Sequence, residues 1–181
     1  MQSQATDIQK RFQTLLKEHR RIVFHVARMY ESHPDDRHDL VQEICSQLWR
    51  AFPAYDEGRR FSTWMYRVAL NTGITHLRRA GARTDRFEPL SDELLEATGE
   101  IAPDPATEER LRELDALIAQ LDPLNRALIL LYLEDQPYAE IAEVLGISET
   151  NVATKISRIK QRFRQQMTNE AATPGSRHGT R

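Results

Sequence analysis

The stretch from Pro137 to Met167, PYAEIAEVLGISETNVATKISRIKQRFRQQM, decides the fold of the C-terminal part of the chain. It predicts a short helix, a tight turn and a longer basic helix. Gly146 can adopt the left-handed conformation that ends a helix. Ser148 stands at the N-cap position, where its hydroxyl can accept a backbone N–H of the next helix. This order is typical of a helix-turn-helix, whose second helix enters the major groove of DNA.

The second of these helices has two different faces. Val152, Ile156, Ile159 and Phe163 recur at helical spacing and predict one buried stripe. The candidate DNA-contacting residues lie at its start or on the other side: Ser148, Asn151, Thr154, Lys155, Arg158 and Arg162. The alternative is an ordinary helical hairpin with a solvated basic face. In the short helix, Glu140 and Glu143 are interpreted as a solvated face.

Charge is distributed unevenly along the 181 residues, although the net charge is only −2. Residues 59–86 hold seven Arg against one Asp, and residues 148–167 hold five Lys or Arg against one Glu. Between these blocks, residues 84–109 hold nine Asp or Glu against a single Arg. This pattern predicts two phosphate-facing surfaces separated by an acidic segment. The single cysteine, Cys45, excludes an internal disulfide and fits a reducing cytosol.

The N-terminal part of the chain predicts three further helices. Residues 8–30 form a first amphipathic helix that includes Ile8, and a second begins after His33-Pro34, capped by Asp35 or Asp36. The second runs to about residue 52 with its apolar side inward: Leu40, Ile44, Cys45, Leu48, Trp49 and Phe52. The third spans 61–79, after a loop that exposes Tyr55. Its polar stripe comprises Thr63, Arg67, Asn71, Thr75 and Arg78.

No segment alternates for long enough to be a strand, so the predicted fold class is all-α, with two small helical domains. The expected organisation is an N-terminal domain at 1–80, a flexible acidic linker at 81–105, a helix-turn-helix domain at 106–167 and a disordered tail at 168–181. The linker has room for one helical turn around residues 92–97. The chain shows no apolar run long enough to cross a membrane and no signal peptide, which predicts a soluble cytoplasmic protein.

Two segments resemble those of bacterial RNA polymerase sigma factors of the extracytoplasmic-function (ECF) group of the sigma-70 family. The N-terminal match is DLVQEICSQLW at 39–49 with FSTWMYRVALNTGITHLRR at 61–79, and the C-terminal match is LDPLNRALILLYLEDQPYAEIAEVLGIS at 121–148, continuing to about residue 164. Together they cover about two thirds of the chain, in the family's order and spacing.

The resemblance implies a factor that binds core RNA polymerase and directs promoter-specific transcription initiation. It implies contacts with the clamp of the largest polymerase subunit through Asp39, Leu40, Gln42, Glu43 and Gln47. It implies minus-ten recognition and melting by Arg60, Thr63, Arg67, Asn71, Thr75, Arg78 and Arg79. The helix-turn-helix would read the minus-thirty-five element beside the flap of the second-largest subunit, and an anti-sigma factor is a further implied partner.

Opening a duplex requires side chains that hold an unpaired base, and aromatic rings do this by stacking. Tyr55, Tyr66 and Trp64 are the candidates, with Trp64 on the inward stripe. The chain also departs from the family pattern. Four residues after Asn71 the chain has Thr75, where relatives often have Asp. In the recognition helix, relatives commonly have glycine-threonine-valine followed by Lys-Ser-Arg, whereas this chain has Thr150-Asn151-Val152 followed by Ala153-Thr154-Lys155. Base preferences therefore do not transfer directly from relatives.

Two other classes of protein remain open from the sequence. A two-domain helix-turn-helix regulator, such as a repressor or response-regulator output module, would not bind polymerase. A helical adaptor that binds only proteins would leave both basic stripes unused. An enzyme is not expected, because neither a glycine-rich phosphate loop nor a nucleophile elbow is present. The segment HPDDRHD at 33–39 matches no metal-binding spacing, so no metal or other cofactor is expected.

Overall fold

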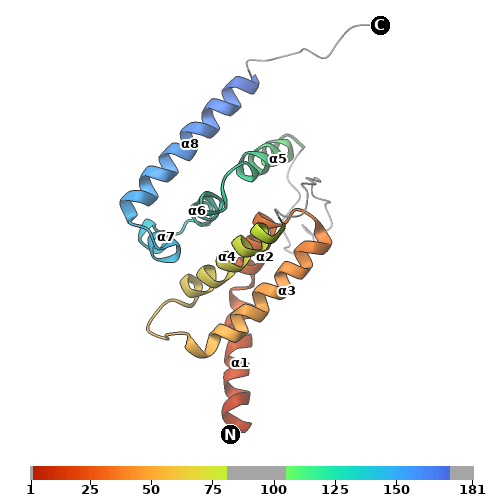
Figure 1. The fold of residues 1–181 in the computed structure, drawn as a ribbon, viewed down its shortest axis with the longest axis vertical. Helices are drawn as coiled ribbons and strands as arrows, with labels where there is room; N and C mark the ends of the chain where they lie inside the picture. Colours follow the sequence, from red (N-terminus) through yellow and green to blue (C-terminus); the bar gives the residue numbers. More distant parts are fainter. Residues whose placement is uncertain (1, 81–104, 172–181) are drawn as a thin grey trace.

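Apolar residues at helical spacing give a fold made of helices alone across the described residues, 2–80 and 105–171, of this computed structural model (Figure 1). The elements are α1 (Gln2–Glu18), α2 (Arg20–Tyr30), α3 (Pro34–Ala51), a 3-10 helix (Phe52–Ala54), α4 (Phe61–Ala80), α5 (Pro105–Ala119), α6 (Pro123–Leu133), α7 (Tyr138–Leu145) and α8 (Glu149–Ala171). The all-α prediction is confirmed. The predicted linker, with its helical turn at residues 92–97, lies outside the described residues except for its last residue, which begins α5.

The expected single helix over residues 8–30 is wrong, because the chain breaks at His19. This residue leaves the helical conformation with φ −108° and ψ 15°. The break separates α1 from α2. Ile8 is 46 % exposed, whereas Ile22 and Val26 are buried. Figure 1 shows α1 projecting from the rest of the bundle.

The start of α3 also differs from the expectation. His33 occupies the N-cap position and Pro34 the first turn, so neither Asp35 nor Asp36 is the cap. Both carboxylates lie in the first turn, where their negative charge interacts favourably with the positive end of the helix dipole. Arg37 is buried and donates to two backbone carbonyls in the turn before the helix, at 3.0 and 2.6 Å.

The packing of α2 against α4 depends on a glycine. Gly73 lies in the middle of α4, and a Cβ atom built on it would come within 2.6 Å of the ring of Tyr30. The same Tyr30 hydroxyl donates a hydrogen bond of 2.8 Å to the carbonyl of Pro123, at the start of α6. The ring is thus held between three helices.

The helix-turn-helix forms as the sequence predicts. Gly146 ends α7 in the left-handed region with φ 67°. The hydroxyl of Ser148 accepts the backbone N–H of Asn151 at 3.2 Å and so caps α8. Upstream, the Asp122 carboxylate accepts two backbone N–H groups of the first turn of α6, at 3.2 and 3.1 Å.

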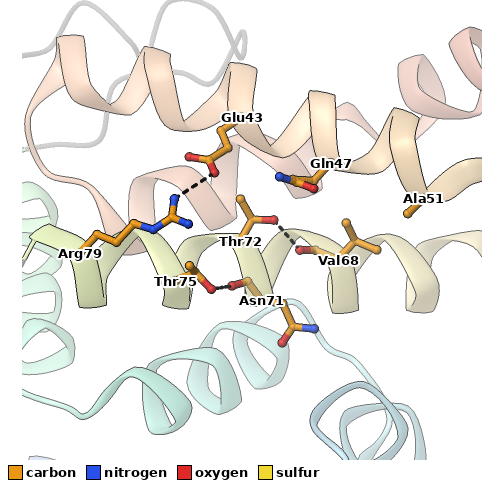
Figure 2. A pocket seen from close by; sticks show the side chains of 8 residues that line it. All are labelled: Glu43, Gln47, Ala51, Val68, Asn71, Thr72, Thr75 and Arg79. Carbon is orange, nitrogen blue, oxygen red and sulfur yellow. Dashed lines mark hydrogen bonds and ion pairs between the residues drawn. The ribbon is translucent and has the colours of Figure 1, made fainter.

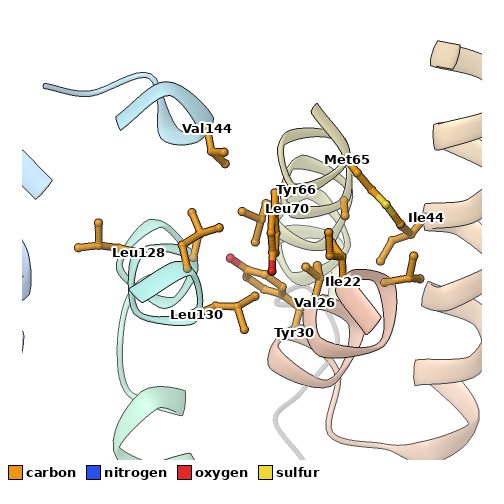
Figure 3. Close-up of a cluster of buried hydrophobic side chains, with 14 of the residues drawn as sticks. Ile22, Val26, Tyr30, Ile44, Met65, Tyr66, Leu70, Leu128, Leu130 and Val144 are labelled. Atoms are coloured by element: carbon orange, nitrogen blue, oxygen red, sulfur yellow. The ribbon is translucent and has the colours of Figure 1, made fainter. Parts of the chain in front are cut away.

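The two predicted domains pack on each other instead of keeping separate cores. Buried residues of both belong to one continuous hydrophobic cluster. Figure 3 shows Leu130 of α6 and Val144 of α7 on the side that faces Tyr30 of α2 and Leu70 of α4. The expectation of two small cores joined only by a tether is therefore incomplete.

The last helix is longer than predicted. α8 continues to Ala171, so the first four residues of the predicted disordered tail are helical. The rest of that tail lies outside the described residues. Figure 1 shows α8 along one edge of the molecule and α3 along the opposite edge, with α2, α4 and α6 between them.

Candidate nucleic-acid interface

The candidate minus-thirty-five residues lie together along one face of the first turns of α8. Ser148, Asn151, Thr154, Arg158 and Arg162 are exposed, and Lys155 is half-buried. On the opposite side, the predicted apolar stripe packs inward: Val152, Ile156 and Ile159 are buried and Phe163 is partly buried against the core. A capped helix therefore presents amide, hydroxyl and cationic groups to solvent, which are the groups that contact base edges and phosphates.

The candidate minus-ten residues on α4 form an exposed stripe with one exception. Arg67, Asn71, Thr75, Arg78 and Arg79 are exposed. Thr63 is only 7 % exposed, because α7 covers it. The Thr75 hydroxyl donates to the carbonyl of Asn71 at 2.8 Å, so its own helix already satisfies that donor.

The aromatic candidates for base stacking are less available than expected. The prediction that the loop exposes Tyr55 is wrong: its ring is half-buried among Phe52, Phe61 and Trp64, and its hydroxyl donates to the carbonyl of Arg59 at 2.6 Å. Trp64 is also half-buried and packs against the core, as its place on the inward stripe predicts.

Tyr66 is removed from the stacking candidates altogether. Its side chain is 3 % exposed, and burial raises the pKa of its hydroxyl well above the usual range. The ring lies between α4 and the C-terminal helices, where no base can reach it without opening the packing (Figure 3).

The candidate polymerase-binding residues occupy one side of α3. Asp39 and Gln42 are exposed, and Glu43 and Gln47 are half-buried. Leu40 is fully buried, so its side chain belongs to the core and is not available to a partner.

The prediction that Trp49 faces inward is wrong. Its side chain is 43 % exposed, with its ring 5.1 Å from that of Phe12. The signal that could have found it is the strict four-residue spacing of Leu40, Ile44 and Leu48, which leaves position 49 beside the buried stripe.

A groove joins the α3 face to the α4 stripe. It has a volume of about 360 Å³ and is lined by Glu43 and Gln47 of α3 and by Asn71, Thr75 and Arg79 of α4, among others. Figure 2 shows Glu43 of α3 and Arg79 of α4 pointing toward each other, whereas the Asn71 amide is turned away from α3. Glu43 and Arg79 form an ion pair of 3.6 Å across it. The candidate polymerase and minus-ten residues are therefore neighbours.

The interpretation of Glu140 and Glu143 as a solvated face is wrong for Glu140, whereas Glu143 is exposed as interpreted. The Glu140 side chain is only 17 % exposed; it accepts from Arg60 and, at 3.2 Å, from the Thr63 hydroxyl. Glu143 pairs with Arg59 at 2.9 Å. The sequence could not place these carboxylates, because their partners lie about 80 residues away.

Residues 2–80 and 105–171 hold no cluster of three or more His, Cys, Asp or Glu placed to bind a metal ion. Cys45 is half-buried, and burial raises the pKa of its thiol, which makes it a poor nucleophile. No helix there is long and apolar enough to cross a membrane.

These features define a helical protein with a helix-turn-helix and a second polar-basic stripe. Family comparisons assign both parts. Residues 15–83 match Sigma-70 region 2, and residues 111–163 match Sigma-70, region 4. The two matches cover about two thirds of the chain. The chain belongs to the sigma-70 family and, within it, to the ECF group.

Similar proteins agree with this assignment. The chain is 26 % identical to RNA polymerase sigma factor SigV of Bacillus subtilis over 87 % of its length and 91 % of that protein. It is 29 % identical to ECF sigma factor SigW of the same species, over 71 % and 74 %. The fold resembles that of the sigma factor RpoE, solved with the anti-sigma factor NepR from Bartonella quintana, with a TM-score of 0.63 and 18 % identity over 90 % and 97 % of the two chains.

The chain is therefore an alternative sigma factor that binds core RNA polymerase and directs promoter-specific transcription initiation. This function excludes the repressor and adaptor alternatives as its main role. Sigma factors are initiation factors and not enzymes, so the helices have to bind and position nucleic acid but not to perform bond chemistry.

Proposed function

We propose that the sigma activity is divided among three surfaces of the chain. The first is the exposed face of α8, which reads the minus-thirty-five element through Asn151, Thr154, Lys155, Arg158 and Arg162. The observation that carries this assignment is the capped start of α8. The bond from the backbone N–H of Asn151 to Ser148 fixes where the helix begins, while Val152 and Ile156 point into the core. Asn151 and Thr154 are then directed away from the protein, as groove-reading side chains must be.

The second surface lies on α4 and reads and opens the minus-ten element. Arg60, Arg67, Asn71, Arg78 and Arg79 are exposed and can hold phosphates and an extruded base edge. Thr63 and Thr75 lie on the same stripe. The half-buried rings of Tyr55 and Trp64 adjoin this surface, with their centroids 5.2 Å apart. Their partial exposure limits stacking, which favours dependence on well-matched promoters.

The third surface is the side of α3 that binds the polymerase clamp. Asp39 and Gln42 are exposed there, and Glu43 and Gln47 line the groove shared with α4. Exposed Trp49 lies on the same helix and can add apolar contact area. Leu40 supports this face from the core.

The proposed domain organisation follows from these surfaces. Residues 1–80 carry the clamp and minus-ten functions, and residues 106–167 carry the minus-thirty-five function beside the polymerase flap. The acidic segment at 81–105 connects them. The protein acts in the cytoplasm, where its polymerase partner works. An anti-sigma factor is a further proposed partner, supported by the fold shared with the sigma factor solved with NepR.

Gel filtration with purified bacterial core RNA polymerase tests the polymerase surface. Wild-type protein should co-elute with the core enzyme, and Asp39→Asn combined with Gln42→Ala should reduce the bound fraction. Asp7→Asn is the matched control, since Asp7 is exposed on α1, outside the proposed surface. Equal retention of the α3 variant and the control would refute the assignment of α3 to polymerase.

A further inference from the structure

Thr154 occupies the middle of the exposed face at the start of α8. It lies two positions after Val152 and two before Ile156, both of which are buried. Two residues correspond to about 200° of rotation around a helix, so the Thr154 side chain leaves the helix almost opposite the core. Asn151 and Lys155 are each next to one of these buried residues and lie at the flank of the same face. Among the candidate residues of α8, Thr154 is therefore turned most directly away from the protein.

The width of the helix relates this arrangement to the major groove. The groove is about 12 Å wide and a helix with its side chains is about 10–12 Å across, so the helix fills it. The middle of the exposed face then meets the base edges, and the flanks meet the phosphates. A short side chain such as that of Thr154 can reach a base only from the middle. Its exposed neighbours Ala153 and Ser157 are also small and do not hold the helix away from the bases.

The Thr154 hydroxyl donates its hydrogen to the carbonyl of Thr150, one turn earlier in the helix, at 2.8 Å. This bond turns Oγ1 towards the helix backbone and restricts the rotamer of the side chain. The Cγ2 methyl group is the other branch of the same carbon and takes no part in the bond. Thr154 therefore presents a base with a methyl group and with an oxygen that can accept a hydrogen bond but not donate one.

One base offers an apolar group in the major groove. Thymine has its C5-methyl group there, whereas adenine, guanine and cytosine present N–H donors and nitrogen or oxygen acceptors. A contact between the two methyl groups removes both from water, which is favourable. Any other base at that position leaves the Thr154 methyl group against polar atoms, which lose their water without gaining a hydrogen bond.

We propose that Thr154 selects a thymine in the minus-thirty-five element through contact between its Cγ2 methyl group and the C5-methyl group of the base. This inference rests on the proposed assignment of α8 to that element. It makes Thr154 a residue that determines specificity, because a methyl–methyl contact depends on the base, whereas a phosphate contact does not.

Holoenzyme made from core RNA polymerase and the full chain provides the test. Its distal promoter motif is first selected from linear duplex DNA with randomised upstream sequence. Each thymine of that motif, on either strand, is then replaced in turn by deoxyuridine, which lacks only the C5-methyl group, and binding is measured by fluorescence anisotropy of the labelled duplex. For wild type, deoxyuridine at one position should weaken binding about fourfold, the factor that corresponds to one buried methyl group.

Two substitutions separate the methyl group of Thr154 from its hydroxyl group. Thr154→Ser keeps the hydroxyl and removes the methyl, so it should bind the thymine duplex about fourfold more weakly than wild type and no longer distinguish it from the deoxyuridine duplex. Thr154→Val keeps a methyl group and removes the hydroxyl, so it should still distinguish the two duplexes. Discrimination that is kept by Thr154→Ser, or lost by Thr154→Val, overturns the proposal.

Thr168→Ser is the matched control. Thr168 is exposed on the same helix, and its hydroxyl donates to the carbonyl of Arg164 at 2.8 Å, the same kind of bond as at Thr154. It lies about 21 Å further along, where a straight helix that enters the groove with its first turns has left it. This variant should keep the wild-type discrimination between the two duplexes.

Failure of this inference can be told apart from failure of the proposed function. If the holoenzyme selects no distal motif, the assignment of α8 to the minus-thirty-five element is contradicted, and the role of Thr154 with it. If a distal motif is selected but holds no thymine on either strand, or if no deoxyuridine substitution weakens wild-type binding, only the contact between Thr154 and thymine is contradicted.

Discussion

Gly73 is the residue where α2 and α4 approach most closely. In an exposed helix, replacing glycine by alanine usually stabilises by about 1 kcal/mol. Here the added methyl group would meet the Tyr30 ring at 2.6 Å, and that ring is held by its bond to the Pro123 carbonyl. We therefore expect Gly73→Ala to lower the free energy of unfolding by about 1–3 kcal/mol, measured by urea denaturation.

Gly58→Ala is the control for this substitution. Gly58 lies in the exposed loop before α4, and a Cβ there would meet the Asp56 carboxylate at 3.2 Å, a contact that a flexible side chain can relieve. Its stability should stay within about 0.5 kcal/mol of wild type. Gly73→Ala as stable as wild type would show that α2 and α4 are not packed as described.

Lys155 and Arg158 test the recognition face. Replacing either by alanine should weaken promoter binding by about 1–3 kcal/mol if the side chain contacts a base. If it contacts only phosphate, the loss should be similar on all sequences and the salt dependence shallower. Lys160→Ala is the matched control, because Lys160 is an exposed cation on the same helix whose ammonium group donates to the Tyr132 hydroxyl of α6 at 3.2 Å. Promoter affinities measured by fluorescence anisotropy should be lower for the Lys155 and Arg158 variants than for the Lys160 variant. Equal affinities of all three would contradict the assignment of α8 to DNA binding.

Glu134, which contacts His25 between the two domains, makes the free energy of unfolding depend on pH in the acid range. The hydrogen bond with His25 lowers the pKa of this carboxyl below its usual value, against the opposing effect of burial. A depressed carboxyl pKa adds stability above its unfolded value of about 4.3, and this stability is lost as pH falls through the folded pKa. Urea unfolding at a series of pH values should therefore show a weaker acid dependence for Glu134→Gln than for wild type. Glu113→Gln, at an exposed site, should follow wild type; identical profiles for all three would refute this.

At the scale of elements, α4 has one side buried in the core and one side exposed to solvent. Its core side includes Met65 and Ala69, both fully buried, whereas Arg67 and Asn71 are exposed one turn apart. Changes on the exposed side should therefore alter stability by no more than about 0.5 kcal/mol.

Promoter opening is the function expected of that side. Asn71→Ala should still form holoenzyme and bind the upstream element but should fail to unpair the minus-ten region, because the amide that holds the extruded base is lost. Permanganate reactivity of unpaired thymines measures this, with upstream binding as the internal control. Wild-type opening by Asn71→Ala combined with Arg67→Ala would assign melting to the loop at residues 55–60 instead.

Elements with local signals were predictable from the sequence. The turn at Gly146, the cap at Ser148 and the apolar stripe of α8 depend on neighbours within a few residues, and each forms as expected. The break at His19 carries no glycine or proline, so the pattern of residues 8–30 continued through it. Helix ends that depend on where neighbouring helices pack cannot be read from one segment.

At the scale of the whole molecule, the exposure of single side chains depends on how the domains meet. In the sequence, Glu140 is interpreted as a solvated residue and Tyr66 as a candidate for base stacking. In the structure, Glu140 is shielded by Arg60 and Thr63, and Tyr66 is covered by the C-terminal helices. Their partners are distant along the chain, so helical periodicity held no information about them. The resemblance to a family predicted the two domains and their roles, but the packing between them required the structure.

Run-off transcription with purified core RNA polymerase tests the central claim most directly. The template is a library of linear DNA with randomised upstream sequence, from which transcribed members are selected and sequenced. We predict transcripts only when the chain is added, enrichment of two separated upstream motifs, and loss of the distal motif when Arg158 is replaced by alanine. Core enzyme that yields the same transcripts with and without the chain would contradict the account.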